Sequence, residues 1–276
     1  NEEFNAETHG ALAYNASLPM FKKNLEKNRI SFFTPKASLR YAPGHMRDID
    51  GDGLRLSYSN LFELNKSSQL DVLESGASAA VGLEFSNLDF EKNKTGSENY
   101  SLYLGQIYNF EENFDMPSRS SLDQKVSDLV GRASVKFSEN FSVENEFSVD
   151  QNLNEINYNN LKASFVLGNA KFNMGYLEEN NHIGTSSYLK SDIKIEINKS
   201  NNLSFDLKKN LETDSTEFYN LAYNYFNDCL KAGLVYRREY YTDRDIETSD
   251  TLMFNITLFP FGKVSLPSID RWKKNY

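Results

Sequence analysis

The fold is decided by a stretch near the end of the chain in which alternate side chains are apolar. The stretch is Leu230-Lys231-Ala232-Gly233-Leu234-Val235-Tyr236-Arg237. In an extended strand successive side chains point to opposite faces, so Leu230, Ala232, Leu234 and Tyr236 share one face. The other face carries Lys231 and Arg237. The stretch therefore predicts a strand with one dry face and one wet face.

The same alternation recurs through the whole chain, whereas helical periodicity is nearly absent. Residues 251–258 repeat it, with apolar Leu252, Phe254, Ile256 and Leu258 against Thr251, Met253, Asn255 and Thr257. The predicted strands are 9–22, 29–41, 54–62, 74–88, 99–110, 126–137, 141–150, 154–167, 170–179, 186–197, 201–211, 215–226, 230–241 and 250–259. Strands of about 10 residues can cross a bilayer at a tilt.

The connections between these strands alternate between tight turns and longer loops. Residues 138–140, 168–169 and 199–201 are short polar turns of Asn, Gly and Ser type, whereas 111–125 and 242–249 are long and charged. Short turns at one end of a sheet and long loops at the other are typical of outer-membrane barrels. We therefore predict an all-β fold, an antiparallel transmembrane β-barrel in which about 12–14 strands are present.

The composition at first suggests a soluble chain, with 39% hydrophobic residues and a mean hydropathy of −0.60. No apolar run approaches the roughly 18–20 residues of a membrane helix, which excludes a helical membrane protein. Barrel strands are apolar on one face only, so a transmembrane barrel can also have a low hydrophobic fraction and a negative mean hydropathy. The alternative is a soluble β-sandwich, which would have to accommodate charged strand faces. The net charge of −9 argues against a nucleic-acid partner.

The charged face of the predicted strands offers candidate lumen residues. We expect the following side chains to line a hydrophilic path: Lys194, Glu196, Lys208, Lys231, Arg237 and Glu239.

Sequence motifs for metal binding or catalysis are incomplete or missing. Asp48, Asp50 and Asp52 match the start of a Ca²⁺ loop, but Ser59 stands where a bidentate Glu belongs, so an acidic surface loop is the alternative. His9, His45 and His182 are scattered, and no nucleophile elbow or phosphate loop occurs. We expect no cofactor and no enzymatic activity.

Three groups of segments stand out when they are taken in order. The first is residues 58–66, followed by 71–76 and the strand that ends at 82–85; the second is 104–108 followed by 127–132; the third is 227–229 leading into 235–240. Together they resemble the LptD family of lipopolysaccharide (LPS) assembly proteins, and the resemblance covers residues 10 to 260. It implies a non-enzymatic transporter in the outer membrane of a Gram-negative bacterium, with LPS and membrane lipids as its partners.

The resemblance also implies that residues 1–259 are the C-terminal part of a larger barrel and that 260–276 form a periplasmic tail. Family members carry an N-terminal jelly-roll that receives LPS from an LptA-like periplasmic bridge, and an LptE-like lipoprotein plugs their barrel. The last strand, 250–259, would line a lateral gate for the lipid tails. Its gate-facing residues would be Thr251, Met253, Asn255 and Thr257.

Cys229 is the only cysteine of the chain. In the resembled family, cysteines at this place form disulfides with cysteines near the N-terminus. Many relatives have two adjacent cysteines here, whereas Asp228 precedes a single one in this chain. We expect Cys229 to be paired with a segment that precedes this chain.

Two other functions stay open at this stage. A complete, smaller porin would close its sheet by bonding 250–259 to the first strand. An outer-membrane enzyme would need a compact site with a nucleophile and a base.

Overall fold

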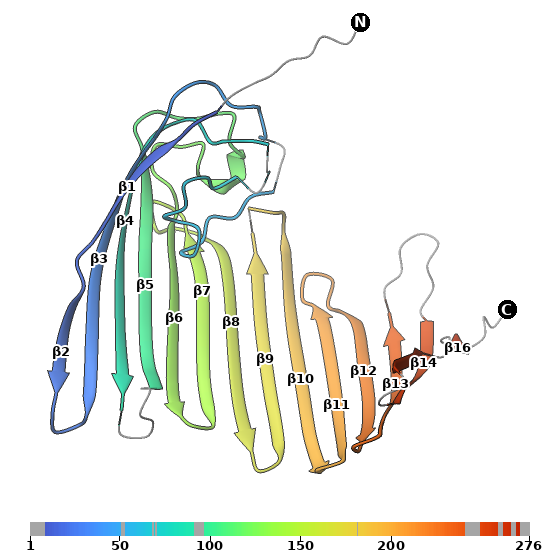
Figure 1. Cartoon of the computed structure of the whole chain (residues 1–276). Helices are drawn as coiled ribbons and strands as arrows, with labels where there is room; N and C mark the ends of the chain where they lie inside the picture. Colours follow the sequence, from blue (N-terminus) through green and yellow to red (C-terminus); the bar gives the residue numbers. More distant parts are fainter. Residues whose placement is uncertain are drawn as a thin grey trace, which may run out of the picture. The chain divides into compact units, whose positions relative to one another are not determined.

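The structure is a computed structural model that describes residues 9–50, 53–67, 69, 71–90, 97–180, 182–240 and 249–258, with the backbone alone for 262–265 and 269–270. These residues form one antiparallel sheet and a single short 3₁₀ helix, η1 (Ser118–Ser120) (Figure 1). The strands are β1 (Leu12–Ser17), β2 (Met20–Asn24), β3 (Arg29–Ala42), β4 (Gly76–Asp89), β5 (Ser97–Asn109), β6 (Leu129–Ser138), β7 (Phe141–Val149), β8 (Ile156–Leu167), β9 (Ala170–Glu179), β10 (Ser186–Asn198), β11 (Asn201–Asn210), β12 (Ser215–Phe226), β13 (Leu230–Glu239), β14 (Ser249–Leu258), β15 (Gly262–Ser265) and β16 (Ile269–Asp270).

The strands follow one another across the sheet nearly in chain order. The path of hydrogen-bonded neighbours runs from β1 through β3, β4 and onward to β15, while β2 also pairs with β3 and β16 with β14. Sequential neighbours joined by hairpins are what antiparallel strands allow. The expected all-β antiparallel fold is confirmed.

Among the described residues, no helix is both long and apolar enough to cross a membrane.

Two strand predictions differ from the structure. The predicted strand 54–62 is wrong, because these residues form a connection between β3 and β4. The predicted strand 9–22 is divided into β1 and β2 near Pro19, which has no N–H to donate to a ladder. Pro35 stays inside β3, where its carbonyl oxygen accepts a hydrogen bond from the Leu18 N–H at 3.1 Å.

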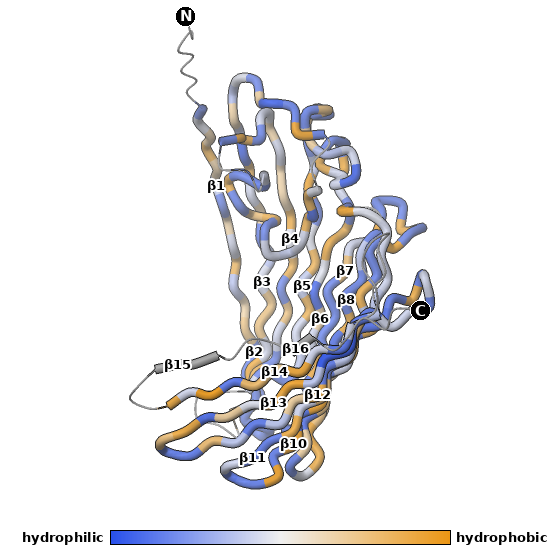
Figure 2. The backbone as a smooth tube through the Cα atoms, turned by 90° about the vertical axis from the view of Figure 1, so that its right-hand side faces the viewer, coloured by the Kyte–Doolittle hydropathy of each residue, from blue (hydrophilic) through white to orange (hydrophobic). Residues whose placement is uncertain are grey.

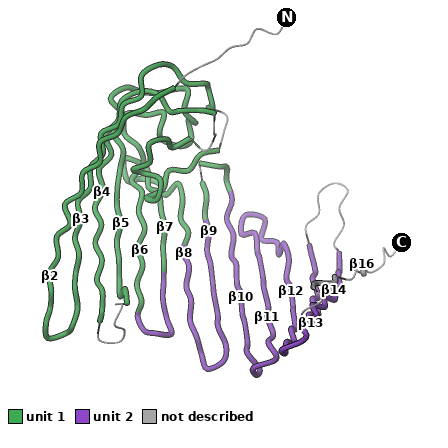
Figure 3. Tube along the Cα trace, viewed as in Figure 1, with its two compact units in different colours: residues 1–136, 144–160, 178–185 green, residues 137–143, 161–177, 186–276 purple. Residues whose placement is uncertain are grey.

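The chain divides into two compact units (Figure 3). Unit 1 holds residues 1–136, 144–160 and 178–185; unit 2 holds 137–143, 161–177 and 186–276. In unit 1 the long β3–β4 and β5–β6 connections lie at the same end of their strands (Figure 1). They enclose a small apolar core made of Met46, Ile49, Leu54, Leu56, Leu61, Val72, Ala80, Ile107, Met116, Leu122 and Val130.

Unit 2 is a run of hairpins whose strands alternate in hydropathy along their length (Figure 2). Its tight turns join β10 to β11 and β12 to β13, as the sequence predicted for 199–201. Asn residues stabilise these turns: Asn198 Oδ1 accepts the Ser200 N–H at 2.9 Å, and Asn227 Oδ1 accepts the Leu230 N–H at 2.7 Å. Side-chain acceptors of this kind are what make Asn a turn residue.

Candidate functional site: the polar face of the sheet

The pairing register of unit 2 sorts its side chains onto two faces. Residues directly opposite each other on antiparallel strands point to the same side of the sheet. The pairs Lys194↔Ser204, Glu196↔Asn202 and Asn202↔Asn224 define one side, which continues through Asn224↔Gly233 into β13. We call this side the polar face of unit 2 and the opposite side its apolar face.

All the residues predicted to line a hydrophilic path lie on the polar face of unit 2. Lys208 is opposite Phe218, and Phe218 is opposite Glu239. Lys231 is opposite Thr257, and Arg237 is opposite Thr251. The predicted gate residues lie on this face of β14: Thr251, Met253, Asn255 and Thr257. Their shared face is a structural fact, whereas their roles in transport stay predictions.

Ion pairs and amide contacts cover this face. Lys208 Nζ lies 2.5 Å from Glu217 Oε2, and Arg237 Nε lies 2.5 Å from Glu239 Oε1. Nearer the middle of the strands, Asn173 Nδ2 donates to Asp192 Oδ1 at 2.6 Å. Such groups need water or one another, so the face suits an aqueous passage.

The apolar face of unit 2 exposes large aliphatic and aromatic side chains instead. Leu221, Leu234 and Leu252 are each 43% exposed, and Phe254 is 39% exposed. Leu221 is opposite Tyr236, which is opposite Leu252, so these residues form one surface. An exposed apolar surface of this kind fits hydrocarbon chains better than water.

Tyrosines cluster on the apolar face, at the ends of the strands that lie farthest from the tight turns. The Tyr219 ring lies 6.2 Å from the Tyr236 ring and 5.9 Å from the Tyr240 ring, measured between centroids. Tyrosine is enriched at membrane–water interfaces, where its ring meets lipid and its hydroxyl meets water.

Unit 1 also has a polar and an apolar face. The connection between β3 and β4 folds back onto its polar face. In the β3–β4 connection, Leu61 and Phe62 pack over Gly105 and Gly82, where an added Cβ would lie 2.2 Å from Leu61 Cδ2 and 2.7 Å from Phe62 Cζ. Tyr58 reaches the same side and donates its hydroxyl to Glu84 Oε1 at 3.1 Å. Glycines at these two strand positions let the connection lie directly on the sheet.

Buried charges anchor this connection to β3. The Arg40 guanidinium donates to the carbonyl oxygens of Leu64 and Glu74, and Lys66 Nζ lies 3.1 Å from Glu74 Oε2. Burial lowers the pKa of Lys66, while the neighbouring Glu74 carboxylate opposes that shift. Burial likewise raises the pKa of Tyr58, an effect to which Glu84 adds. Buried charges persist where they are paired and hydrogen-bonded, which fixes the connection in place.

A second buried network joins the ends of several strands of unit 1, and the sequence analysis missed it. Asp128 Oδ2 accepts hydrogen bonds from Ser148 Oγ and Asn157 Nδ2, each at 2.8 Å, and lies 3.0 Å from His182 Nε2. Burial alone would raise the pKa of Asp128, but bonds from His182, Asn157 and Ser148 outweigh it and leave the pKa low. The residues are far apart in sequence, so no spacing motif marks them.

This network has the residue types of a hydrolase triad but not its arrangement. Ser148 and His182 both bond to the same oxygen of Asp128, so the histidine is not placed to take the serine proton. His182 Nδ1 instead faces Glu179, which Arg55 binds through Nε at 3.0 Å. All three triad-type residues are buried.

The acidic motif and the gate strand are only partly described. Asp48 Oδ1 accepts the Asp50 N–H, and Asp50 Oδ1 accepts the Ser118 N–H, each at 2.9 Å, whereas Asp52 lies outside the described residues. Within the described ranges, no group of three or more His, Cys, Asp and Glu side chains is placed to hold a metal ion. The ion site stays a prediction.

The edge of β14 away from β13 pairs with β15 and β16, for example at Thr257↔Lys263 and Leu252↔Ile269. Along the described strands, the path that ends at β15 does not return to β1, so the closure expected of a complete porin is not seen. Much of the predicted tail 260–276 lies outside the described residues. Cys229 is exposed in the β12–β13 turn, and its pairing stays a prediction.

A long antiparallel sheet with an ion-paired polar face and an exposed apolar face defines an outer-membrane protein of the transmembrane β-strand class. Within that class, the sequence model of the family LptD, LPS transport system D, matches residues 15–211, so the chain belongs to the LptD family. Its function is LPS transport and assembly in the outer membrane, with LPS as the substrate.

Comparison with solved structures finds chains of low similarity, among them mutants of a bacterial porin. A chain described as "Asymmetric conductivity of engineered proteins" has a TM-score of 0.42 and 10% identity, covering 94% of this chain and 85% of that one. A triple mutant of Rhodopseudomonas blastica porin has a TM-score of 0.37 and 9% identity, covering 94% and 89%. No curated protein matches the chain.

Proposed function

We propose that this chain forms part of the wall of the LPS-inserting barrel of a Gram-negative bacterium, and that its polar face is the path of the LPS sugars. The observation that carries the proposal is the shared face of Lys194, Lys208, Lys231 and Arg237 in a chain of the LptD family. Cations and amides on this face can bind phosphates and sugar hydroxyls, while the apolar face contacts the membrane.

The lipid tails need a separate exit, because acyl chains are as unsuited to the polar face as sugars are to hydrocarbon. We propose that they leave beside β14, with Thr251, Met253, Asn255 and Thr257 lining the gate. In support, the far edge of β14 pairs with the short strands β15 and β16, and short pairings are easily exchanged for others.

The partners follow from the same proposal. An LptE-like lipoprotein would contact the polar face, and an LptA-like periplasmic bridge would deliver LPS through a domain that precedes this chain. No step of this transport makes or breaks a covalent bond, so we propose a non-enzymatic role for the chain.

Depletion of the protein from growing cells tests the proposal. Newly made LPS, labelled metabolically, should stop reaching the cell surface, while porins continue to assemble. Restoring the wild-type gene should restore arrival of LPS, whereas a Lys231→Glu/Arg237→Glu variant that folds should not. Normal LPS arrival without the protein would contradict the proposed function.

A further inference from the structure

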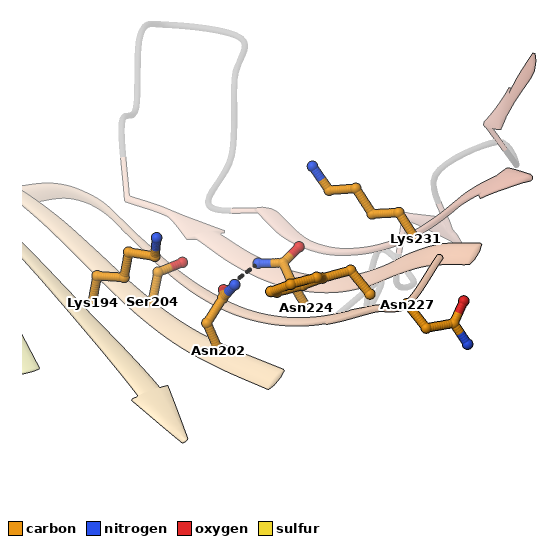
Figure 4. Close-up of a pocket in the computed structure, with 7 residues that line it drawn as sticks. Lys194, Asn202, Ser204, Asn224, Asn227 and Lys231 are labelled. Carbon is orange, nitrogen blue, oxygen red and sulfur yellow. Dashed lines mark hydrogen bonds between the residues drawn. The ribbon is translucent and has the colours of Figure 1, made fainter. Parts of the chain in front are cut away.

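A groove lies on the polar face of unit 2, at the tight-turn end of β10 to β13 (Figure 4). Its volume is about 510 Å³, large enough for a sugar with a phosphate group. Lys194, Asn202, Ser204, Asn224, Phe226 and Lys231 line it, together with Asn227 of the turn.

The groove is locally cationic in a chain whose net charge is −9. Two ammonium groups, those of Lys194 and Lys231, border it, and no carboxylate belongs to its lining. Lys194 Nζ lies 3.5 Å from Glu196 Oε1, but both side chains are about half exposed or more, so this pair is weak. In the part of the chain that the structure describes, Lys231 has neither an ion pair nor a hydrogen bond.

A second groove on the same face provides a contrast. It has a volume of about 430 Å³ and includes Lys162, Lys190 and Lys208, but Asp192 and Asp206 also line it, and Lys208 is already paired with Glu217. Those two aspartates are directly opposite each other on β10 and β11. Their carboxylates repel an anion, so the tight-turn groove is the better anion site of the two.

The neutral groups of the tight-turn groove suit a sugar. Asn224 Nδ2 donates to Asn202 Oδ1 at 3.0 Å, which leaves Asn224 Oδ1 and Asn202 Nδ2 for a ligand's hydroxyls (Figure 4). Phe226, 39% exposed, offers an apolar surface to a sugar ring. Gly233 is opposite Asn224, and a Cβ there would lie 3.0 Å from Asn224 Oδ1, so glycine leaves this amide oxygen uncrowded.

We propose that this groove is a binding site for a phosphorylated sugar, which in this transporter is the phosphorylated head group of LPS. The inference rests on the proposed function and adds a defined binding site at the tight-turn end of the LPS path. Lys194 and Lys231, on β10 and β13 at opposite sides of the groove, each offer an ammonium group to phosphate. The two amides bind hydroxyls, and Phe226 contacts the ring. A phosphate bound by an ammonium group forms charge-assisted hydrogen bonds, which are stronger than neutral ones.

Binding of three probes to the purified protein in detergent tests the site: lipid A, enzymatically dephosphorylated lipid A, and inorganic phosphate. Lipid A should bind at least about tenfold more tightly than its dephosphorylated form, because only the phosphorylated form makes charge-assisted hydrogen bonds to the lysines. The Lys194→Gln/Lys231→Gln variant should lose that preference. The matched control is Lys171→Gln/Lys199→Gln, which removes the same charge from exposed lysines outside the groove.

A Gly233→Val variant tests the site without changing its charge, since the added side chain crowds the Asn224 amide oxygen. It should weaken lipid A binding, and heat-dependent electrophoretic mobility confirms that each variant is folded.

Equal binding of phosphorylated and dephosphorylated lipid A, or equal loss in the control variant, would overturn the site while leaving LPS transport standing. Inorganic phosphate that binds as tightly as lipid A would indicate a free-anion site and would also overturn it. Failure of the wild-type protein to bind lipid A in any form would contradict both the site and the proposed function.

Discussion

Asp128 shows how single residues hold the long connections of unit 1 in place. Three donors from three other parts of the chain converge on its buried carboxylate. Removing the charge leaves Ser148, Asn157 and His182 with a weaker acceptor in a site that water does not reach. We expect Asp128→Asn to lower the free energy of unfolding by about 2–4 kcal/mol at pH 7.

The pH dependence of this effect follows from the lowered pKa of Asp128. A carboxyl whose folded-state pKa lies below its unfolded value, about 3.9, stabilises the fold above that value. The stabilisation is lost as the pH falls through the folded-state pKa. Urea unfolding should show a large difference between wild type and Asp128→Asn at pH 7 that shrinks below about pH 4. A difference that does not change with pH, or an equal loss in exposed Asp228→Asn, would contradict this role.

Cys229 provides a second prediction at the scale of one residue. Its exposure in the β12–β13 turn leaves its thiol accessible to a partner, and exported proteins meet an oxidising periplasm. Non-reducing electrophoresis of the protein from cells should show a compact, faster-migrating form that reductant and Cys229→Ser both abolish. A mobility that neither change affects would show that Cys229 is unpaired.

The strands of unit 2 depend on which face each side chain occupies. Leu234 lies on the apolar face and its neighbour Val235 on the polar face. Leu234→Lys should therefore cost about 2–4 kcal/mol in a bilayer, whereas Val235→Lys should be tolerated. The folded fraction in lipid vesicles, read from heat-dependent mobility, measures both. Similar losses in the two variants would show that the faces are assigned wrongly.

The sequence predicted most of these strands, because alternation is a local property that each strand carries by itself. It failed at 54–62, where Leu54, Leu56 and Leu61 are buried as in a strand but within the connection core. Asn60 makes the difference: its side chain bonds to Ser57 N at 2.8 Å and to the Arg55 carbonyl oxygen at 3.0 Å, which turns the chain. Alternation alone does not distinguish a strand from an extended connection with the same pattern.

The packing of the β3–β4 connection on the sheet can be tested at the strand glycines that it covers. A Cβ at Gly105 would lie 2.2 Å from Leu61 Cδ2 and 2.9 Å from the Val81 carbonyl oxygen, so backbone or connection must move. Gly105→Ala should expose the connection to trypsin at Lys66, and it should cost about 1–3 kcal/mol. Gly175→Ala is the matched control, because its Cβ would meet nothing closer than 3.9 Å. Unchanged cleavage in Gly105→Ala would contradict the packing described here.

For the whole molecule, the sequence predicted the fold class, the family and the shared face of the lumen candidates. It did not predict the Asp128 network or the tight-turn groove. Both join residues of strands that are distant in sequence, and only the pairing register brings such residues together. Asn202, Asn224 and Gly233, for example, have no common motif but are neighbours across three strands.

The central claim is that LPS passes along the polar face, and site-specific photocrosslinking in living cells tests it most directly. Asn224 and Tyr223 are adjacent in β12 but lie on opposite faces. A photoreactive residue at position 224 should capture newly made LPS, whereas one at 223 should capture phospholipid. Absence of LPS adducts at 224, or equal LPS capture at both positions, would contradict the claim.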